Sequence, residues 1–264
     1  MGTGTIRSLI FSNWIMALFF TPYPIIQGCM PELEELKSGI CLGSLFFLSQ
    51  AICFFALSKG DASLITPIMG TKSVFVAFFV SFFQLTGLPS TFTWVAALLS
   101  AIAVALLSWP QRNKLVSYLA IALGLLTAAG FGLTDALVPH LAQNSSPSQV
   151  IFIMFSTVGI LSFALIPFAE KSILKFNFFA DKWMLCSCLP MGVQAVLMSI
   201  AIGFFAVPTE ANIFYACRGI WAILIAAWLG KKIGLHEGRV DKNVFQRRLL
   251  GAFLLVIGIC FIPL

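Results

Sequence analysis

The chain has 264 residues, of which 59% are hydrophobic and only 10% are charged, far below the roughly 25% charged residues of soluble domains. This composition predicts an all-α integral membrane protein, because the length holds about nine apolar crossings of roughly 20 residues and little else. The net charge of +6 does not indicate nucleic-acid binding, since the bases are spread over short connections without a basic face or an aromatic stacking platform.

In chain order, apolar runs separated by Pro, Gly and charged residues predict nine transmembrane helices. The first run contains Pro22 and Pro24 and lacks a small-residue cleavage site, so we expect a helix there and not a signal peptide. The predicted helices cover residues 6–27, 38–57, 62–86, 92–109, 115–138, 149–168, 183–206, 211–230 and 248–263.

The connections between these helices differ strongly in charge. Lys and Arg concentrate on the cytoplasmic side of short loops. One side has only Lys37, and Lys72 and Arg218 lie inside predicted helices. We therefore expect a multi-pass protein of the plasma membrane, or of the inner membrane in a bacterium, with a cytoplasmic N-terminus and an external C-terminus. The bases assigned to the cytoplasmic side are Arg7, Lys59, Arg112, Lys114, Lys171, Lys175, Lys182, Lys231, Lys232, Arg239, Lys242, Arg247 and Arg248.

No pattern in the chain predicts a metal, a cofactor or an enzyme. Cys186 and Cys188 are not spaced as a metal-binding CxxC motif, and neither His140 nor His236 completes a ligand set. The seven cysteines are an odd number and lie mostly in apolar runs, where cysteine behaves as a small hydrophobic residue. No nucleophile and base converge, and no GxxxxGK[ST] loop for ATP occurs.

The chain also contains an internal repeat. Phe54-Phe55-Ala56, Asp61-Ala62 and a helix with Gly70 and a base match Phe204-Phe205-Ala206, Glu210-Ala211 and a helix with Gly219 and a base. The helix at 115–138 has no counterpart, so residues 1–110 hold four helices and residues 111–264 hold five. Because an odd number of helices separates equivalent ones, the two repeats have inverted topology, which is common in secondary transporters.

These strings resemble the drug/metabolite transporter superfamily, and specifically its EamA-type members. The resemblance covers nearly the whole chain, and it implies two inverted five-helix repeats of which the first helix is missing here. It also implies that both termini are cytoplasmic, which differs from the charge bias. The strings are Asp61-Ala62-Ser63-Leu64-Ile65-Thr66-Pro67-Ile68, Gly70-Thr71-Lys72, Arg218-Gly219-Ile220-Trp221 and Arg248-Leu249-Leu250-Gly251-Ala252.

Lys72 and Arg218 are the leading candidates for substrate binding, because a charge inside a membrane helix usually faces protein or a watery cavity. Lys72 either receives an anionic group of the substrate or pairs with a carboxylate and locks helices together. Arg218 has Tyr215 at i−3 and Trp221 at i+3, which predicts a guanidinium between aromatic walls. The alternative is that Asp135 or a helix end holds Arg218, and that the aromatic residues are core or interface anchors.

Asp135, Gln50 and Gln194 complete the predicted set. Asp135 is the carboxylate well inside a predicted helix, and it is either a salt-bridge partner or a proton-coupling group. If Asp135 pairs with Arg218, Lys72 lacks a fixed counter-ion, and a bound anion would supply one. Gln50 and Gln194 either line the same cavity or bridge helices.

Together these patterns predict a secondary transporter that moves a small polar metabolite, anionic or zwitterionic, by alternating access at a midplane site between the repeats. The competing hypothesis is a membrane protein without transport activity, such as a truncated paralogue or an assembly partner of a transporter. The sequence leaves open the substrate, the direction, a coupling proton or other ion, and the oligomeric state.

Overall fold

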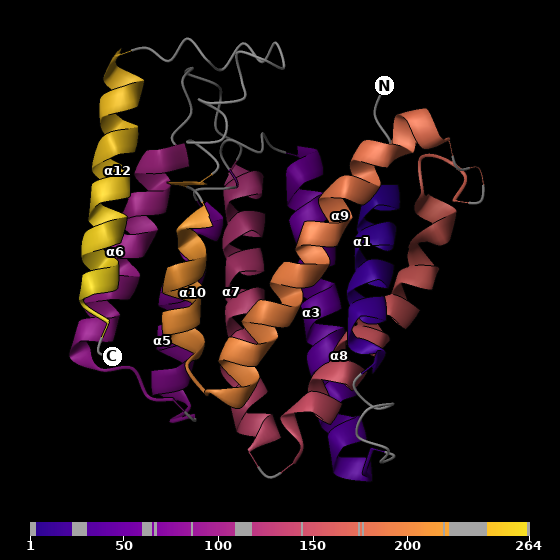
Figure 1. Cartoon of the computed structure of the whole chain (residues 1–264). Coiled ribbons are helices and arrows are strands. Elements are labelled where there is room, and N and C mark those ends of the chain that lie inside the picture. The colour runs from indigo at the N-terminus through magenta and orange to yellow at the C-terminus, as the bar shows by residue number, and fades with distance from the viewer. Residues whose placement is uncertain are drawn as a thin grey trace. The chain divides into compact units, whose positions relative to one another are not determined.

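The computed structural model describes residues 4–22, 31–59, 65, 68–85, 87–108, 118–143, 145–173, 175, 177–218, 220–221 and 242–262 (Figure 1). These residues form helices and contain no strand, which confirms the predicted all-α class. In chain order the helices are α1 Thr5–Phe20, α3 Leu33–Lys59, α5 Lys72–Phe82, α6 Thr91–Ser108, α7 Tyr118–Ala142, α8 Pro147–Leu161, η1 Ser162–Phe168, α9 Phe178–Ser199, η2 Ile200–Phe204, α10 Pro208–Ala216 and α12 Lys242–Cys260.

Within the described ranges, four helical segments are long and apolar enough to cross a membrane: Leu33–Leu57, Tyr118–Ala142, Pro147–Phe168 and Asp181–Phe204. Three shorter apolar helices accompany them, at Thr5–Phe20, Lys72–Phe82 and Thr91–Leu107. The length and composition of these helices accord with the predicted membrane class.

Several helix limits differ from the predicted ones. The sixth helix starts at Pro147 and not at 149, because Ser146 occupies the N-cap position and Pro147 has no backbone donor to lose at the first helical position. From Ser162 it continues as a 3₁₀-helix. The seventh starts at Phe178 and not at 183, so Lys182 lies inside α9 and not in a loop. That helix ends in the π-helical turn η2.

The chain packs into two compact units that do not coincide with the predicted repeats. Unit 1 contains Met1–Phe54 and Leu137–Val207, and unit 2 contains Phe55–Ala136 and Pro208–Leu264. Each unit therefore combines segments from residues 1–110 with segments from 111–264. The units do not test the repeat boundaries, which remain a prediction.

In unit 1, α1 packs against α8 and α9 (Figure 1). Glycines allow the close approaches: a Cβ on Gly43 of α3 would lie 2.5 Å from the Met154 carbonyl oxygen of α8. A Cβ on Gly192 of α9 would lie 2.6 Å from the Phe19 ring of α1. Small residues at such contacts are typical of helices that pack without a hydrophobic driving force from water.

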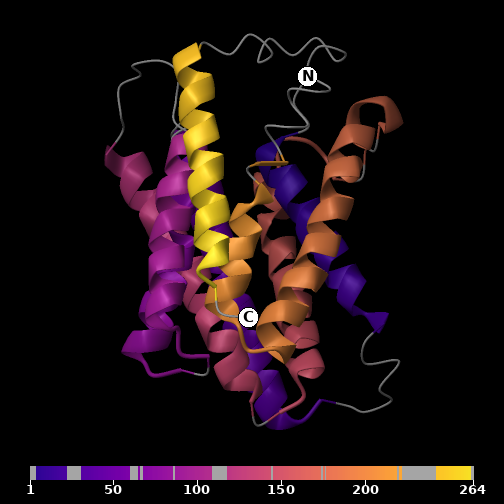
Figure 2. The ribbon, with the colours of Figure 1, turned by 60° about the vertical axis from the view of Figure 1, so that its left-hand side comes forward.

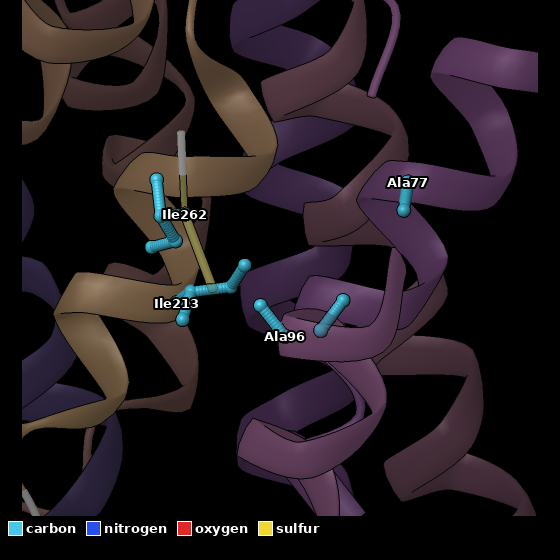
Figure 3. Packing of buried hydrophobic residues seen from close by; sticks show 5 residues of the cluster. Ala77, Ala96, Ile213 and Ile262 are labelled. Carbon is cyan, nitrogen blue, oxygen red and sulfur yellow. The ribbon is translucent and has the colours of Figure 1, made fainter. Parts of the chain in front are cut away.

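In unit 2, α6 and α12 lie side by side along their length (Figures 1 and 2). A Cβ on Gly251 of α12 would lie 2.8 Å from the Ala103 carbonyl oxygen of α6. At one end of this pair, α5 and α10 join a tightly packed core cluster (Figure 3). The buried members of the cluster are Ala77, Ala96, Ala97, Ile213 and Ile262.

Candidate functional site: a buried ion pair in unit 2

An ion pair joins α5 to α7 inside unit 2. The Lys72 Nζ lies 2.6 Å from the Asp135 Oδ2, and the two side chains are 17% and 10% exposed. Gly132, one turn before Asp135 on α7, allows the approach, because a Cβ there would lie 2.9 Å from the Phe75 Cβ of α5. Lys72 thus has a fixed counter-ion at charge-assisted hydrogen-bond distance.

A third helix contributes to the same group. The Asn212 Nδ2 of α10 donates to the Asp135 Oδ2 at 2.7 Å and to the Pro208 carbonyl at 2.8 Å. The Asn212 Oδ1 is buried and has no hydrogen-bond partner. The same holds for the Thr209 Oγ1, which lies three residues earlier on α10. Buried polar atoms are normally satisfied, so two unpaired oxygens on one short helix need an explanation.

Both bases follow an irregular turn in their helices. The regular part of α5 begins at Lys72, after a tight turn in which the Thr71 amide donates to the Ile68 carbonyl at 3.0 Å. Helix α10 ends at Ala216, and the Cys217 amide donates in the same way to the Phe214 carbonyl at 3.0 Å, directly before Arg218. A cation in the first turn of a helix is disfavoured by the helix dipole, so Lys72 depends on Asp135 there.

Aromatic rings surround the bases. The Lys72 Nζ lies 5.6 Å from the centre of the Phe131 ring and 6.0 Å from that of Tyr215. The Arg218 guanidinium carbon lies 4.1 Å from the centre of the same Tyr215 ring, and the guanidinium donates to the Tyr215 hydroxyl. Tyr215 therefore contacts both bases, and four of the predicted site residues lie together in unit 2: Lys72, Asp135, Tyr215 and Arg218.

The sequence left open which base pairs with Asp135, and the structure gives the answer. Asp135 pairs with Lys72 and not with Arg218, so the inference that Lys72 lacks a fixed counter-ion is wrong. Among the described residues, Arg218 has no carboxylate within ion-pair distance, and its side chain is exposed. The unneutralised base of this group is thus Arg218.

The remaining predicted site residues are placed differently. Trp221 is 64% exposed. Gln50 and Gln194 belong to unit 1. Gln50 is buried with an unpaired Oε1, whereas Gln194 is half-buried.

Unit 1 contains an ion pair that the sequence did not predict. The Arg7 guanidinium makes two bonds to the Asp181 carboxylate, at 2.7 and 2.9 Å, and both side chains are almost fully buried. Arg7 was counted among the cytoplasmic bases and lies near the start of the predicted helix 6–27; in the structure it lies in the first turn of α1.

Two further polar residues, Asn13 and Asn212, were not predicted from the sequence. Asn13, fully buried on α1, donates to the Ser162 hydroxyl at 2.8 Å. Asn212 is an amide inside an apolar run, the same signal that singled out Gln50 and Gln194, so it could have been found.

Within the parts of the chain that are described, no three His, Cys, Asp or Glu side chains are arranged to hold a metal ion. The chemistry available at the site is therefore ionic and hydrogen bonding: an ammonium, a carboxylate, a guanidinium and an amide.

No protein-family model and no curated protein matches the chain. A solved structure described as "Crystal structure of protein" is similar, with a TM-score of 0.67 and 12% sequence identity. The alignment covers 99% of this chain and 87% of that chain. At this identity the likeness shows a shared fold and carries no functional information.

Proposed function

We propose that the protein is a multi-pass membrane transporter that carries a small polar metabolite with at least one negative group, and that Lys72 and Arg218 bind that group. The observation that carries the proposal is the Lys72–Asp135 pair, in which Asp135 is buried and Lys72 is half-buried, with Asn212 bonded to Asp135 and a second base on the adjoining Tyr215 ring.

A purely structural role would not explain this group well. Replacing a buried ion pair by well-packed apolar residues is often neutral or stabilising, so an ion pair between apolar helices is weak evidence for a stability device. The group also leaves two buried oxygens unpaired, on Thr209 and Asn212. A polar ligand that donates hydrogen bonds could satisfy both.

The charges favour a negative or zwitterionic ligand. Lys72 and Asp135 neutralise each other, and Arg218 adds one positive charge beside Tyr215. A guanidinium binds carboxylate or phosphate in a bidentate manner, and Tyr215 offers an aromatic face for the rest of the ligand. A metabolite that is only cationic would meet a net positive site.

The arrangement of helices within each unit supports an inverted repeat. In unit 1, α1 and α8 run antiparallel, with Asn13 bonded to Ser162 and Phe20 stacked on Phe155. Asn13 and Ser162 are 149 residues apart, the same offset that separates Asp61 from Glu210 and Gly70 from Gly219. Residues at equivalent positions of two inverted repeats can contact each other only near the two-fold axis that relates the repeats. The Asn13–Ser162 contact therefore supports such an axis.

In unit 2, α6 and α12 are also antiparallel, since Gly251 faces Ala103 and Gly258 faces Ala96. Gly251 and Ala103 differ by 148 residues, which again places near-equivalent positions opposite each other at the middle of the pair.

The interrupted helices before Lys72 and Arg218 fit the same proposal. In transporters with inverted repeats, helices broken at the binding site commonly supply the groups that bind substrate and ions. On this basis we assign the chain to the EamA-type drug/metabolite transporters, with residues 1–110 and 111–264 as the two repeats. Exposed apolar side chains along the helices, such as Phe82, Leu98 and Phe205, would then face lipid.

The test is metabolite exchange in vesicles. Proteoliposomes with the full chain are loaded or bathed with a metabolite extract, and mass spectrometry identifies what crosses. Lys72→Met and Arg218→Met should each abolish the transport of any metabolite moved by the wild type. Lys37→Met is the matched control, because Lys37 is exposed and pairs only with Glu34 on the same helix.

Two outcomes would count against the proposal. If no metabolite crosses with the wild type, the alternative of a non-transporting membrane protein replaces it. If Lys72→Met transports fully, the ion pair is structural and the binding site lies elsewhere.

A further inference from the structure

We propose that Asp135 is a proton-loading site: when an anion draws the Lys72 ammonium away, the Asp135 carboxylate takes up a proton, and anion and proton cross together. The coupling step rests on the proposed function, whereas proton loading itself does not.

The first argument is the environment of Asp135. Its Oδ2 accepts from both the Lys72 ammonium at 2.6 Å and the Asn212 amide at 2.7 Å. The carboxylate is nearly buried between apolar helices, so almost all of its stabilisation as an anion comes from these two donors. Only one of them, Lys72, carries a charge.

The neighbouring charged groups do not replace Lys72. Arg218, which follows the end of α10, is bound to the Tyr215 hydroxyl. Glu210, at the other end of α10, accepts from the Thr93 hydroxyl of α6 at 3.2 Å. Asn212 carries no charge. If Lys72 turns to a substrate anion, Asp135 is left with one neutral donor in an apolar interior, where an unpaired charge is costly.

The unpaired oxygen of Asn212 fits the protonated state. A protonated Asp135 has an O–H that needs an acceptor, and a half-turn of the Asn212 amide would present its Oδ1 in place of its Nδ2. In the ion-paired state this oxygen is buried without a partner. The Asn212 amide can thus donate to the carboxylate form of Asp135 and accept from its carboxyl form. Neither an aliphatic nor a charged side chain could do both.

The charge balance gives the stoichiometry. Before binding, the ammonium and the carboxylate sum to zero. A monovalent anion then pairs with the ammonium, which keeps its proton, and one proton from water converts the carboxylate to a carboxyl group. The pair and its ligand again sum to zero, so the proposal is an electroneutral symport of one anion charge with one proton.

The decisive experiment needs no substrate, because Lys72→Met imitates the loss of the ammonium. Infrared spectra of the reconstituted full chain at pH 7 are compared between Lys72→Met and Lys72→Met/Asp135→Asn. A carboxyl C=O band that shifts in D₂O, present in the first and lost in the second, is expected. Arg218→Met removes the same charge but leaves the ion pair, so it and the wild type should lack the band.

A missing band in Lys72→Met would overturn the proposal, and so would an equal band in Arg218→Met. Lys72→Gln, which is polar and of similar length, replaces Lys72→Met if the latter does not fold, with the same expected band.

A transport arm separates this proposal from the proposed function. With a metabolite identified in the vesicle experiment, an enclosed pH dye should report acidification during anion uptake. Uptake without acidification would refute coupling and leave the transporter intact. If no metabolite crosses at all, the proposed function fails, while the infrared result still decides whether Asp135 loads a proton.

Discussion

Arg7 and Asp181 show how strongly single side chains of this protein depend on a distant partner. Arg7 also donates to the Lys175 carbonyl at 3.2 Å and lies 5.6 Å from the centre of the Phe11 ring. With side chains only 2% and 3% exposed, neither charge can turn to water if the other is removed. The pair therefore couples the first turn of α1 to the first turn of α9.

We expect Asp181→Asn to destabilise unit 1 and lower the melting temperature, because it leaves the Arg7 charge buried and unpaired. The double variant Arg7→Met/Asp181→Leu should recover most of this loss. Thermal unfolding in detergent measures both. Equal destabilisation by the single and the double variant would mean that packing, and not charge, dominates here.

Glu170 is a second residue whose charge matters. Its carboxylate accepts from the backbone amides of Thr5 at 2.9 Å and Ile6 at 3.2 Å, at the N-terminus of α1. Partial burial raises the pKa of Glu170, but backbone donors, including its own amide and those of Ile6, Arg7 and Thr5, outweigh it and lower the pKa below 4.5. A negative charge at this position also suits the helix dipole.

Because the folded pKa of Glu170 is lowered, its contribution to stability is present above about pH 4.5 and is lost as the pH falls through the folded pKa. We expect Glu170→Gln to lower the melting temperature at pH 7, and the difference from the wild type to shrink as the pH falls through the folded pKa of Glu170. Glu34→Gln, at an exposed carboxylate paired with Lys37, is the control and should change little at pH 7. A melting-temperature difference that does not shrink in acid would contradict this assignment.

At the residue scale, the sequence predicted which side chains are unusual better than it predicted how they pair. A charge within an apolar run is visible without a structure, and Lys72, Asp135 and Arg218 were found in this way. Their pairing was not, because Asp135 is far from both bases in sequence and only the packing of α5 on α7 decides between them. The pairing of Arg7 was missed because its partner Asp181 is 174 positions away in the sequence.

At the scale of helices, close packing depends on glycines at particular contacts. Gly39 and Gly43 lie on one face of α3, and a Cβ on either would come within 2.6 Å of an α8 atom. Gly258 of α12 differs, since a Cβ there would meet the Ala96 carbonyl oxygen at 3.4 Å, an ordinary contact distance.

These distances give a matched pair of variants. Gly43→Ala should destabilise the protein by about 1 to 3 kcal/mol, because the added methyl group overlaps the α8 backbone and forces the helices apart. Gly258→Ala should be neutral or slightly stabilising, because alanine also favours the helix. Unfolding of both variants in the same detergent gives the comparison, and equal effects would show that these contacts relax freely.

Helix prediction succeeded where apolar length alone decides and failed at special backbone geometry. The limits of α6 at Thr91–Ser108 lie within one residue of the predicted 92–109. Within the predicted helix at 62–86, α5 covers Lys72–Phe82, and the described residues directly before it form a tight turn at Thr71. Apolar composition does not distinguish a continuous helix from an interrupted one, nor an α-helix from the 3₁₀ and π segments η1 and η2.

For the whole molecule, the proposed orientation depends in part on bases that lie outside the described residues. Arg112, Lys114, Lys231, Lys232 and Arg239 are all among them. The prediction itself is unchanged: the C-terminus is external and the connection that follows residue 221 is cytoplasmic.

Reporter fusions test the orientation. A reporter active only outside the cytoplasm should be active after Leu264, and a reporter active only in the cytoplasm should be active at Gly234. The reverse pattern at both positions would invert the orientation. A cytoplasmic signal at both would favour the family's arrangement, with both termini on the same side.

The Arg7–Asp181 pair also constrains how the chain is made. The two residues are 174 positions apart. At about 5 to 20 residues per second, the ribosome needs roughly 10 to 35 s to reach Asp181 after Arg7. During that delay α1 has no partner for its guanidinium, and Arg7 is near enough to the helix end to reach the headgroups of the bilayer. The contact between the first turn of α1 and the first turn of α9 can therefore form only after Asp181 has been synthesised.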